Sequence, residues 1–183
     1  MRDNPKLTLI ENGTLGVAIL VLGIMAGFFW TYTFNVNLAM LQVDGEVYAR
    51  VQSFLNENVR HPMFFLFFFG GGFFPILALL ANMRRWRTFS FWLIALAVVI
   101  YVAGVIVFTH QVNLPLNYDT ESWQPSNLPA DWMETRNKWN EANTVRVATS
   151  LLAFLLCIVA LALRANQQSV LIDCTSRSSN VDV

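Results

Sequence analysis

The chain has 183 residues, of which 55% are hydrophobic and 13% charged, and its formal net charge is zero. Soluble domains carry about 25% charged residues, so this composition argues against a water-soluble protein and predicts that lipid covers most of the surface. A net charge of zero gives no support to nucleic-acid binding.

Four stretches are long and apolar enough to cross a bilayer, because a spanning helix needs about 20 mostly apolar residues. They cover residues 15–40, 62–81, 88–109 and 144–163. Backbone N–H and C=O groups in lipid have to pair within their own segment, so each stretch is predicted to be a helix. We therefore expect an all-α fold, an integral membrane four-helix bundle formed by residues 1–166, followed by a flexible polar tail over residues 167–183.

Basic residues mark the cytoplasmic side of short membrane loops. Arg84, Arg85 and Arg87 crowd the short connection between the second and third stretches, on the same side as both termini. We therefore expect a multi-pass protein whose termini are both cytoplasmic. On the outer side, residues 47–58 are expected to form a short surface helix. The long loop 113–143 contains three tryptophans and is expected to lie on the membrane as a lid.

Polar and amphipathic side chains gather near the outer ends of all four stretches. Polar groups inside a membrane protein are costly and often functional. Trp139, Asn143 and Arg146 are four and three residues apart, which places them on one helical face. Arg146 offers five fixed donors and suits a carboxylate, an enolate or a phosphate. In chain order the whole set is Asn35, His61, His110, Asn113, Asn117, Trp139, Asn140, Asn143 and Arg146.

Structural roles are an alternative for these residues. Arg146 can extend to the lipid headgroups, Asn35 can hold neighbouring helices together, and Asn140 can cap the fourth helix. A lone histidine at a helix end, such as His61, is more often structural than catalytic. The phenylalanines of residues 64–69 are a packing or lipid-facing surface, or else the wall of a pocket for a flat apolar ligand.

Several short segments resemble one known family. Asn113-Leu114-Pro115-Leu116-Asn117 is similar to the Asn-x-Pro-x-Asn signature of the anthrone-oxygenase-like family of small four-helix membrane proteins, long catalogued only as a domain of unknown function. Trp139-Asn140 with Arg146 resembles its later Trp-Asn…Arg element, and Asn143 fits the usual spacing to Arg146 better than Asn140 does. The resemblance extends over residues 16–163 and implies a four-helix membrane fold.

The start of the second stretch also resembles this family, with two departures. His61-Pro62, followed by phenylalanines and Gly70, is similar to the family's Asn-Pro…Phe-x-Gly, although His61 stands where asparagine is common. The loop between Tyr118 and Lys138 carries aromatic residues of its own. Oxygenase activity belongs to a fungal natural-product subset of the family, so the resemblance implies the fold more firmly than the reaction.

The activity that the resemblance implies is a cofactor-independent oxygenase for an apolar anthrone- or phenol-like substrate. The substrate loses a proton, and its electron-rich anion reacts with dioxygen. His110 or His61 is the candidate base, and Arg146 with Asn113 and Asn143 is the candidate anion-stabilising set. The remaining candidates for substrate binding are Asn35, Asn117, Trp139 and Asn140.

Two other functions remain open at this point. One is a non-enzymatic accessory protein that binds a lipid, a quinone or another membrane subunit, as a homo-oligomer or in a larger complex. The other is a transition-metal site formed by His61, His110 and Glu57, because two histidines and a carboxylate suit iron, copper or zinc.

Overall fold

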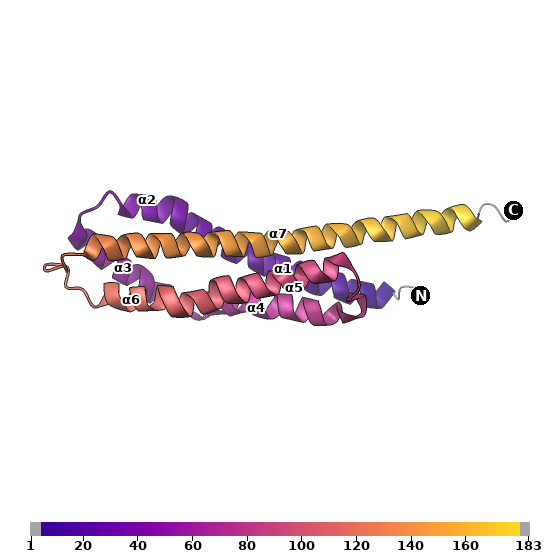
Figure 1. Cartoon of the computed structure of the whole chain (residues 1–183), viewed down its shortest axis with the longest axis horizontal. Coiled ribbons are helices and arrows are strands. Elements are labelled where there is room, and N and C mark those ends of the chain that lie inside the picture. Colours follow the sequence, from indigo (N-terminus) through magenta and orange to yellow (C-terminus); the bar gives the residue numbers. More distant parts are fainter. Residues whose placement is uncertain (1–4, 180–183) are drawn as a thin grey trace.

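A computed structural model describes the backbone of residues 5–179 and the side chains of residues 5–166. All regular elements in this part of the chain are helices, and they pack lengthwise into an elongated bundle of four arms (Figure 1). The first arm consists of α1 (Pro5–Thr31), the π-helical turn η1 (Tyr32–Val36) and α2 (Asn37–Met40). The second arm consists of α3 (Gly45–Asn58) and α4 (Pro62–Ala81).

The third arm follows a short 3-10 turn, η2 (Met83–Arg85), which connects it to α4. It consists of α5 (Phe89–Tyr101), the π-helical segments η3 (Val102–Val107) and η4 (Thr109–Asn113), and α6 (Leu114–Glu121). The fourth arm is the single helix α7 (Trp132–Ser179).

Four helical segments among the described residues are long and apolar enough to cross a membrane. They are Pro5–Met40, Pro62–Ala81, Phe89–Glu121 and Trp132–Asn166. The expected all-α, four-helix membrane bundle is therefore confirmed. Both chain ends lie at the same end of the bundle, hereafter the termini end (Figure 1). That this end is cytoplasmic stays a prediction.

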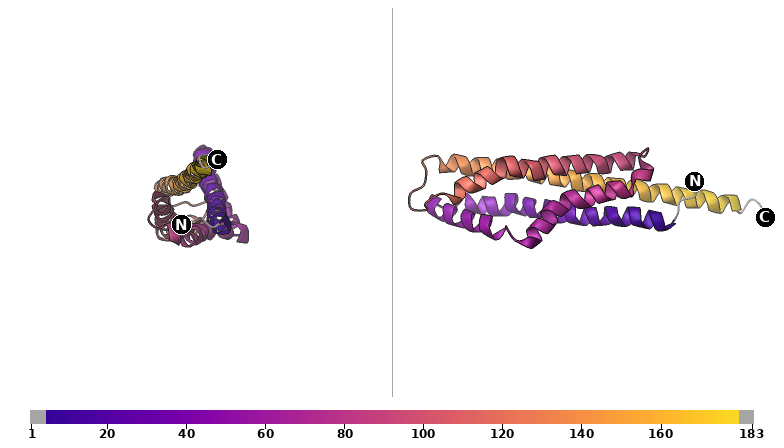
Figure 2. Two further views of the ribbon diagram at one scale, coloured as in Figure 1. Left: turned by 90° about the vertical axis from the view of Figure 1, so that its right-hand side faces the viewer. Right: turned by 90° about the horizontal axis from the view of Figure 1, so that it is seen from below.

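Three of the four candidate spans are longer than a bilayer requires. The 20 residues of α4 make a helix about 30 Å long, which equals the hydrocarbon thickness. Away from the termini, the bundle continues beyond the start of α4 as a helical cap formed by α3, α6 and the first turns of α7 (Figure 2). The loop expected over residues 113–143 is shorter in the structure, because only residues 122–131 of that segment are non-helical. That this segment lies on the membrane stays a prediction.

Two further expectations concern residues 47–58 and the tail from residue 167. Residues 47–58 are helical as expected, within α3, but this helix packs against α6. The backbone of α7 stays helical to Ser179, and residues 180–183 lie outside the described residues. The flexibility expected from residue 167 onward stays a prediction.

Local sequence signals explain where the inner helices begin. The Asp44 side chain caps α3 by accepting a hydrogen bond from the Val47 backbone N–H at 2.9 Å. Thr88 caps α5 in the same way, accepting from the Phe91 N–H at 3.4 Å. Such caps satisfy backbone donors that the first helical turn leaves unpaired.

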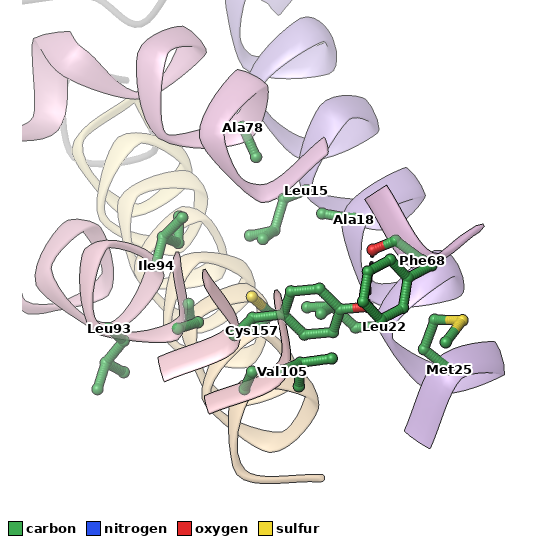
Figure 3. Close-up of a cluster of buried hydrophobic side chains, with 14 of the residues drawn as sticks. Leu15, Ala18, Leu22, Met25, Phe68, Ala78, Leu93, Ile94, Val105 and Cys157 are labelled. Carbon is green, nitrogen blue, oxygen red and sulfur yellow. Dashed lines mark hydrogen bonds between the residues drawn. The ribbon is translucent and has the colours of Figure 1, made fainter. Parts of the chain in front are cut away.

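Buried hydrophobic side chains fill the membrane core (Figure 3), and the helices make close contacts at two glycines. The hydroxyl of buried Tyr101, on α5, donates to the Phe68 carbonyl of α4 at 3.0 Å, and a Cβ added at Gly71 would lie 2.3 Å from that hydroxyl oxygen. Likewise, Thr149 Oγ1 of α7 donates to the Gly104 carbonyl at 3.1 Å. Glycine is needed at these positions because any side chain would push the helices apart.

An ion cluster ties three arms together at the termini end. The buried Glu11 carboxylate lies 2.7 Å from Arg85 Nε and 2.8 Å from Arg164 Nη2. Asn82 accepts a hydrogen bond from Arg164 and donates to the Ala78 carbonyl at 2.7 Å. The cluster therefore links α1, the α4–α5 turn and α7. Glu11 precedes residue 15, where the first apolar stretch was predicted to begin, so its place inside the bundle is visible only in the structure.

We expect Gly71→Ala to destabilise the bundle by about 1–3 kcal/mol, the usual cost of overpacking a filled interior. The new methyl group would displace Tyr101 and break its bond to the Phe68 carbonyl. Thermal unfolding in detergent, followed by circular dichroism, measures the effect. Gly27→Ala is the matched control, because nothing lies within 4 Å of the position that its new methyl group would take. Equal melting temperatures for both variants would contradict the packing argument.

Candidate functional site

A cavity of about 630 Å³ lies at the junction of α3 and α4 and is lined by residues from all four arms. Cavities of about 300–1,000 Å³ are typical of small-molecule sites. Its walls are mainly apolar and aromatic, and a few polar groups face into it. The α3–α4 junction lies where the cap meets the membrane core (Figure 2), and the lining residues place the cavity at this level.

The break in the second arm follows from the sequence His61-Pro62. Proline disfavours the helical conformation in the residue before it, and His61 is accordingly extended, with φ −120° and ψ 159°. Pro62 then opens α4, where its missing N–H is harmless. The second arm is therefore interrupted over residues 59–61, and the interruption contributes lining residues to the cavity.

Two π-helical segments border the same cavity. Tyr32 and Val36 of η1 line it, as does Thr109 of η4. A π-helical turn inserts an extra residue, which re-aims the side chains that follow, and such turns are frequent at functional sites. The sequence shows no signal for them, since both segments read as ordinary apolar helix ends.

Arg146 is the central charged group of the cavity. Its side chain is only 7% exposed, and its Nη2 donates to the Asn143 side-chain oxygen at 2.6 Å. The guanidinium carbon lies 4.8 Å from the ring centre of Phe29 and 5.5 Å from that of Trp139. Among the described residues no carboxylate pairs with Arg146, and its Nε has no hydrogen-bond partner. A buried cation with π-faces and an amide as its neighbours favours an anionic ligand.

Asn143 is held in one orientation by the first arm. Its amide nitrogen donates to Thr33 Oγ1 at 2.6 Å and to the Phe29 carbonyl at 3.3 Å. The amide oxygen is therefore turned toward Arg146 and fixes the guanidinium. In a parallel contact, Trp139 Nε1 donates to the Asn117 side-chain oxygen at 2.6 Å, so α6 and α7 are joined at the cavity wall.

The two histidines take different positions. His61 lines the cavity, and its Nδ1 accepts a hydrogen bond from the Phe64 N–H at 3.4 Å as the cap of α4. His110 is exposed on η4 and is not among the cavity-lining residues, so its expected role as a base in this site has no geometric support. Within the described side chains, no group of three His, Cys, Asp or Glu could hold a metal ion, so Glu57 does not complete a metal site with them.

The other predicted residues divide between the cavity and its surroundings. Asn117, Trp139, Asn143 and Arg146 line the cavity with His61. The remaining three asparagines do not line it: Asn35 is exposed, Asn140 is half-buried, and Asn113 is fully buried with both amide atoms lacking a partner among the described residues.

Sequence reasoning left the role of most of the apolar wall open and missed Phe28. Phe28, Phe64, Phe65, Phe68 and Phe69 all line the cavity. The phenylalanine run at the start of the second stretch was the available signal, and a pocket wall was one of its expected roles. Phe28 had no such signal, because it lies in an unbroken apolar stretch of α1.

The cavity side that faces the cap is closed by a chain of hydrogen bonds. Gln52 donates to Asn56 at 3.0 Å, Asn56 to Thr120 at 3.2 Å, and Thr120 to the Asn117 carbonyl at 2.9 Å. Further into the cap, Tyr48 packs between Trp132 and Arg136. Burial raises the pKa of Tyr48, so this residue remains a neutral phenol and is unsuited to act as a base.

Comparison with known proteins places the matched region on this site. The family described as anthrone oxygenase matches residues 63–156, slightly more than half of the chain. The match begins at α4 and includes Asn117, Trp139, Asn143 and Arg146. No curated protein and no solved structure matches the chain.

We expect Asn143→Leu to destabilise the protein by about 1–3 kcal/mol, because it leaves the buried Arg146 guanidinium without its acceptor. The double variant Asn143→Leu/Arg146→Met removes both partners and should regain part of that loss. Unfolding of the four members of this cycle, measured in one detergent, gives the coupling energy. A double variant whose loss equals the sum of the two single losses would show that the two side chains are not coupled.

Proposed function

The chain belongs to the anthrone oxygenase family, and on that premise we propose that it is a membrane oxygenase for an apolar aromatic substrate with an acidic hydroxyl or methylene group. The observation that carries the proposal is the buried Arg146 guanidinium, which faces a largely aromatic cavity without a carboxylate partner. Such a group binds the anion of the substrate better than the neutral form, and it therefore favours loss of the substrate's proton.

The cavity supports this substrate class by shape and chemistry. Its volume of about 630 Å³ is sufficient for a three-ring aromatic compound. Phe28, Phe64 and Phe68 offer apolar ring surfaces, while Asn117, Asn143 and Arg146 supply polar groups. An anthrone needs both, because its rings are apolar and its carbonyl oxygen carries the negative charge after deprotonation.

The proposed reaction uses dioxygen and no organic cofactor. The anthrone methylene carbon loses a proton, and the negative charge moves to the carbonyl oxygen beside Arg146. The carbanion then transfers electrons to dioxygen and forms a carbon–oxygen bond, which gives a peroxide. Loss of water from this peroxide leaves a second carbonyl group. One oxygen atom enters the quinone, and the other leaves as water with the two methylene hydrogens.

The proton acceptor in this scheme is His61. Among the described lining residues it is the only imidazole, the side chain that most often serves as a general base, and no carboxylate belongs to this lining. Its Nδ1 has to release the long cap bond to the Phe64 N–H before it takes a proton. The main contribution of the protein is therefore the acidification of the substrate by Arg146, with His61 as a modest base. His110 has no part in it.

One observation favours the alternative of a non-enzymatic binding protein. His61, the only candidate base among the described lining residues, already uses its acceptor nitrogen in a helix cap. A protein that merely holds a quinone, a lipid or a neighbouring subunit would need no base. Native mass spectrometry from mild detergent separates the two functions: a stoichiometric partner subunit favours the accessory role, and a retained aromatic compound favours the oxygenase.

We expect Arg146→Ala to lower the turnover of anthrone by about 100-fold or more, the usual loss when a buried anion-stabilising group is removed. Arg146→Lys, which keeps the charge but loses the planar fork, should retain intermediate activity. Oxygen uptake by purified protein in detergent is the measurement, with size-exclusion chromatography as the check on assembly. His110→Ala is the control and should keep wild-type turnover. Wild-type oxygen uptake by a folded Arg146→Ala variant would end the proposal.

A further inference from the structure

We propose that the cavity takes its aromatic ligand directly from the bilayer, through an opening between α1 and α4 framed by Phe28, Phe65 and Phe69. We call these three residues the phenylalanine portal. The ligand class rests on the proposed function, whereas the route rests on the position and exposure of the three side chains.

The first argument is depth. Because α4 is just long enough to cross the hydrocarbon layer, its first residue, Pro62, marks one boundary of that layer. Phe65 and Phe69 follow it by three and seven residues, which puts them about 5 and 10 Å inside the boundary. The surroundings of the bundle at this depth are acyl chains.

The second argument is exposure. Phe65 and Phe69 line the cavity, yet 41% and 54% of their surface is exposed. Phe28 of α1, whose ring contacts Phe64 of α4, also lines the cavity and is 39% exposed. Residues that both line a cavity and reach the molecular surface lie at its edge. The cavity therefore meets the lipid along this edge.

The third argument is the chemistry of the frame. Behind the portal, the Phe64 ring packs against those of Phe28 and Phe68, with ring centres 5.4 Å apart in each pair. An apolar ligand passes such rings without breaking a hydrogen bond or dehydrating a polar group, since only ring rotation is needed. The portal therefore suits a compound that is already dissolved in the membrane.

The fourth argument is that the opposite side is closed by polar bonds. The chain from Gln52 through Asn56 to Thr120 is almost completely buried and shields the cavity from the cap. Beside it, the Arg60 guanidinium donates hydrogen bonds to both carboxylate oxygens of Glu121. Asn58 and Arg60 also line the cavity and are exposed, so a second edge lies near the α3–α4 junction. A ligand that used that edge would pass polar and charged side chains, whereas the route from lipid passes only aromatic rings.

The test uses full-length protein in phosphatidylcholine vesicles that already contain 1,8-dihydroxyanthraquinone, a product-like compound without a methylene group to oxidise. A temperature jump perturbs its binding equilibrium within the membrane, and the compound's own fluorescence gives the relaxation rate. We expect Phe65→Trp, which narrows the portal, to slow relaxation by about threefold or more while occupancy at equilibrium changes less than about twofold. Phe73→Trp is the matched control, since Phe73 is also an exposed phenylalanine of α4 but does not line the cavity.

A second variant tests the competing route from water. Glu121→Gln removes the ion pair with Arg60. It should leave the relaxation rate unchanged if the ligand comes from lipid. Wild-type relaxation in Phe65→Trp, or faster relaxation in Glu121→Gln, would overturn the portal. Failure of the wild-type protein to bind the compound would also overturn the portal. Binding through the portal without any oxidation of anthrone would instead refute the proposed function alone.

Discussion

The buried charge of Arg146 is the constraint on which the other features of the cavity depend. A guanidinium close to the hydrocarbon layer is stable only where fixed dipoles and π-faces replace water. Asn143 supplies an amide oxygen at 2.6 Å, while Phe29 and Trp139 supply ring faces. None of these neutralises the charge. The cavity therefore retains a positive potential that a neutral apolar pocket would lack, and the proposed chemistry uses this potential to hold an anion.

Buried arginines at the two ends of the bundle have different neighbours. At the termini end, Glu11 accepts from Arg85 and Arg164, so the charges there are paired and join three arms. Around Arg146, uncharged groups take the place of a carboxylate. Pairing suits a structural contact, because a guanidinium already bound to a carboxylate has little affinity left for a ligand. The end around Arg146 is the one that contains the cavity.

The space for a ligand exists because the second arm is broken. Pro62 prevents α3 and α4 from forming one continuous helix, and the π-helical turns re-aim side chains on the first and third arms. Beyond the break, α3 and α6 form a cap whose buried hydrogen bonds close the cavity on one side. The same break leaves phenylalanine side chains at the lipid-facing edge, where access for an apolar compound is proposed.

The amino-acid sequence by itself determined the spans, the all-helical fold and the level at which polar groups gather, because hydrophobic length and helical spacing are local properties of the chain. The spacing of Trp139, Asn143 and Arg146 was sufficient to place them together, since one helix carries all three. Only the tertiary structure decided that His110 lies outside the cavity, that Phe28 lies in its wall, and that Glu11 pairs with arginines from distant arms. Those outcomes depend on how each helix is rotated about its axis and on π-helical turns, and neither is encoded in local hydrophobicity.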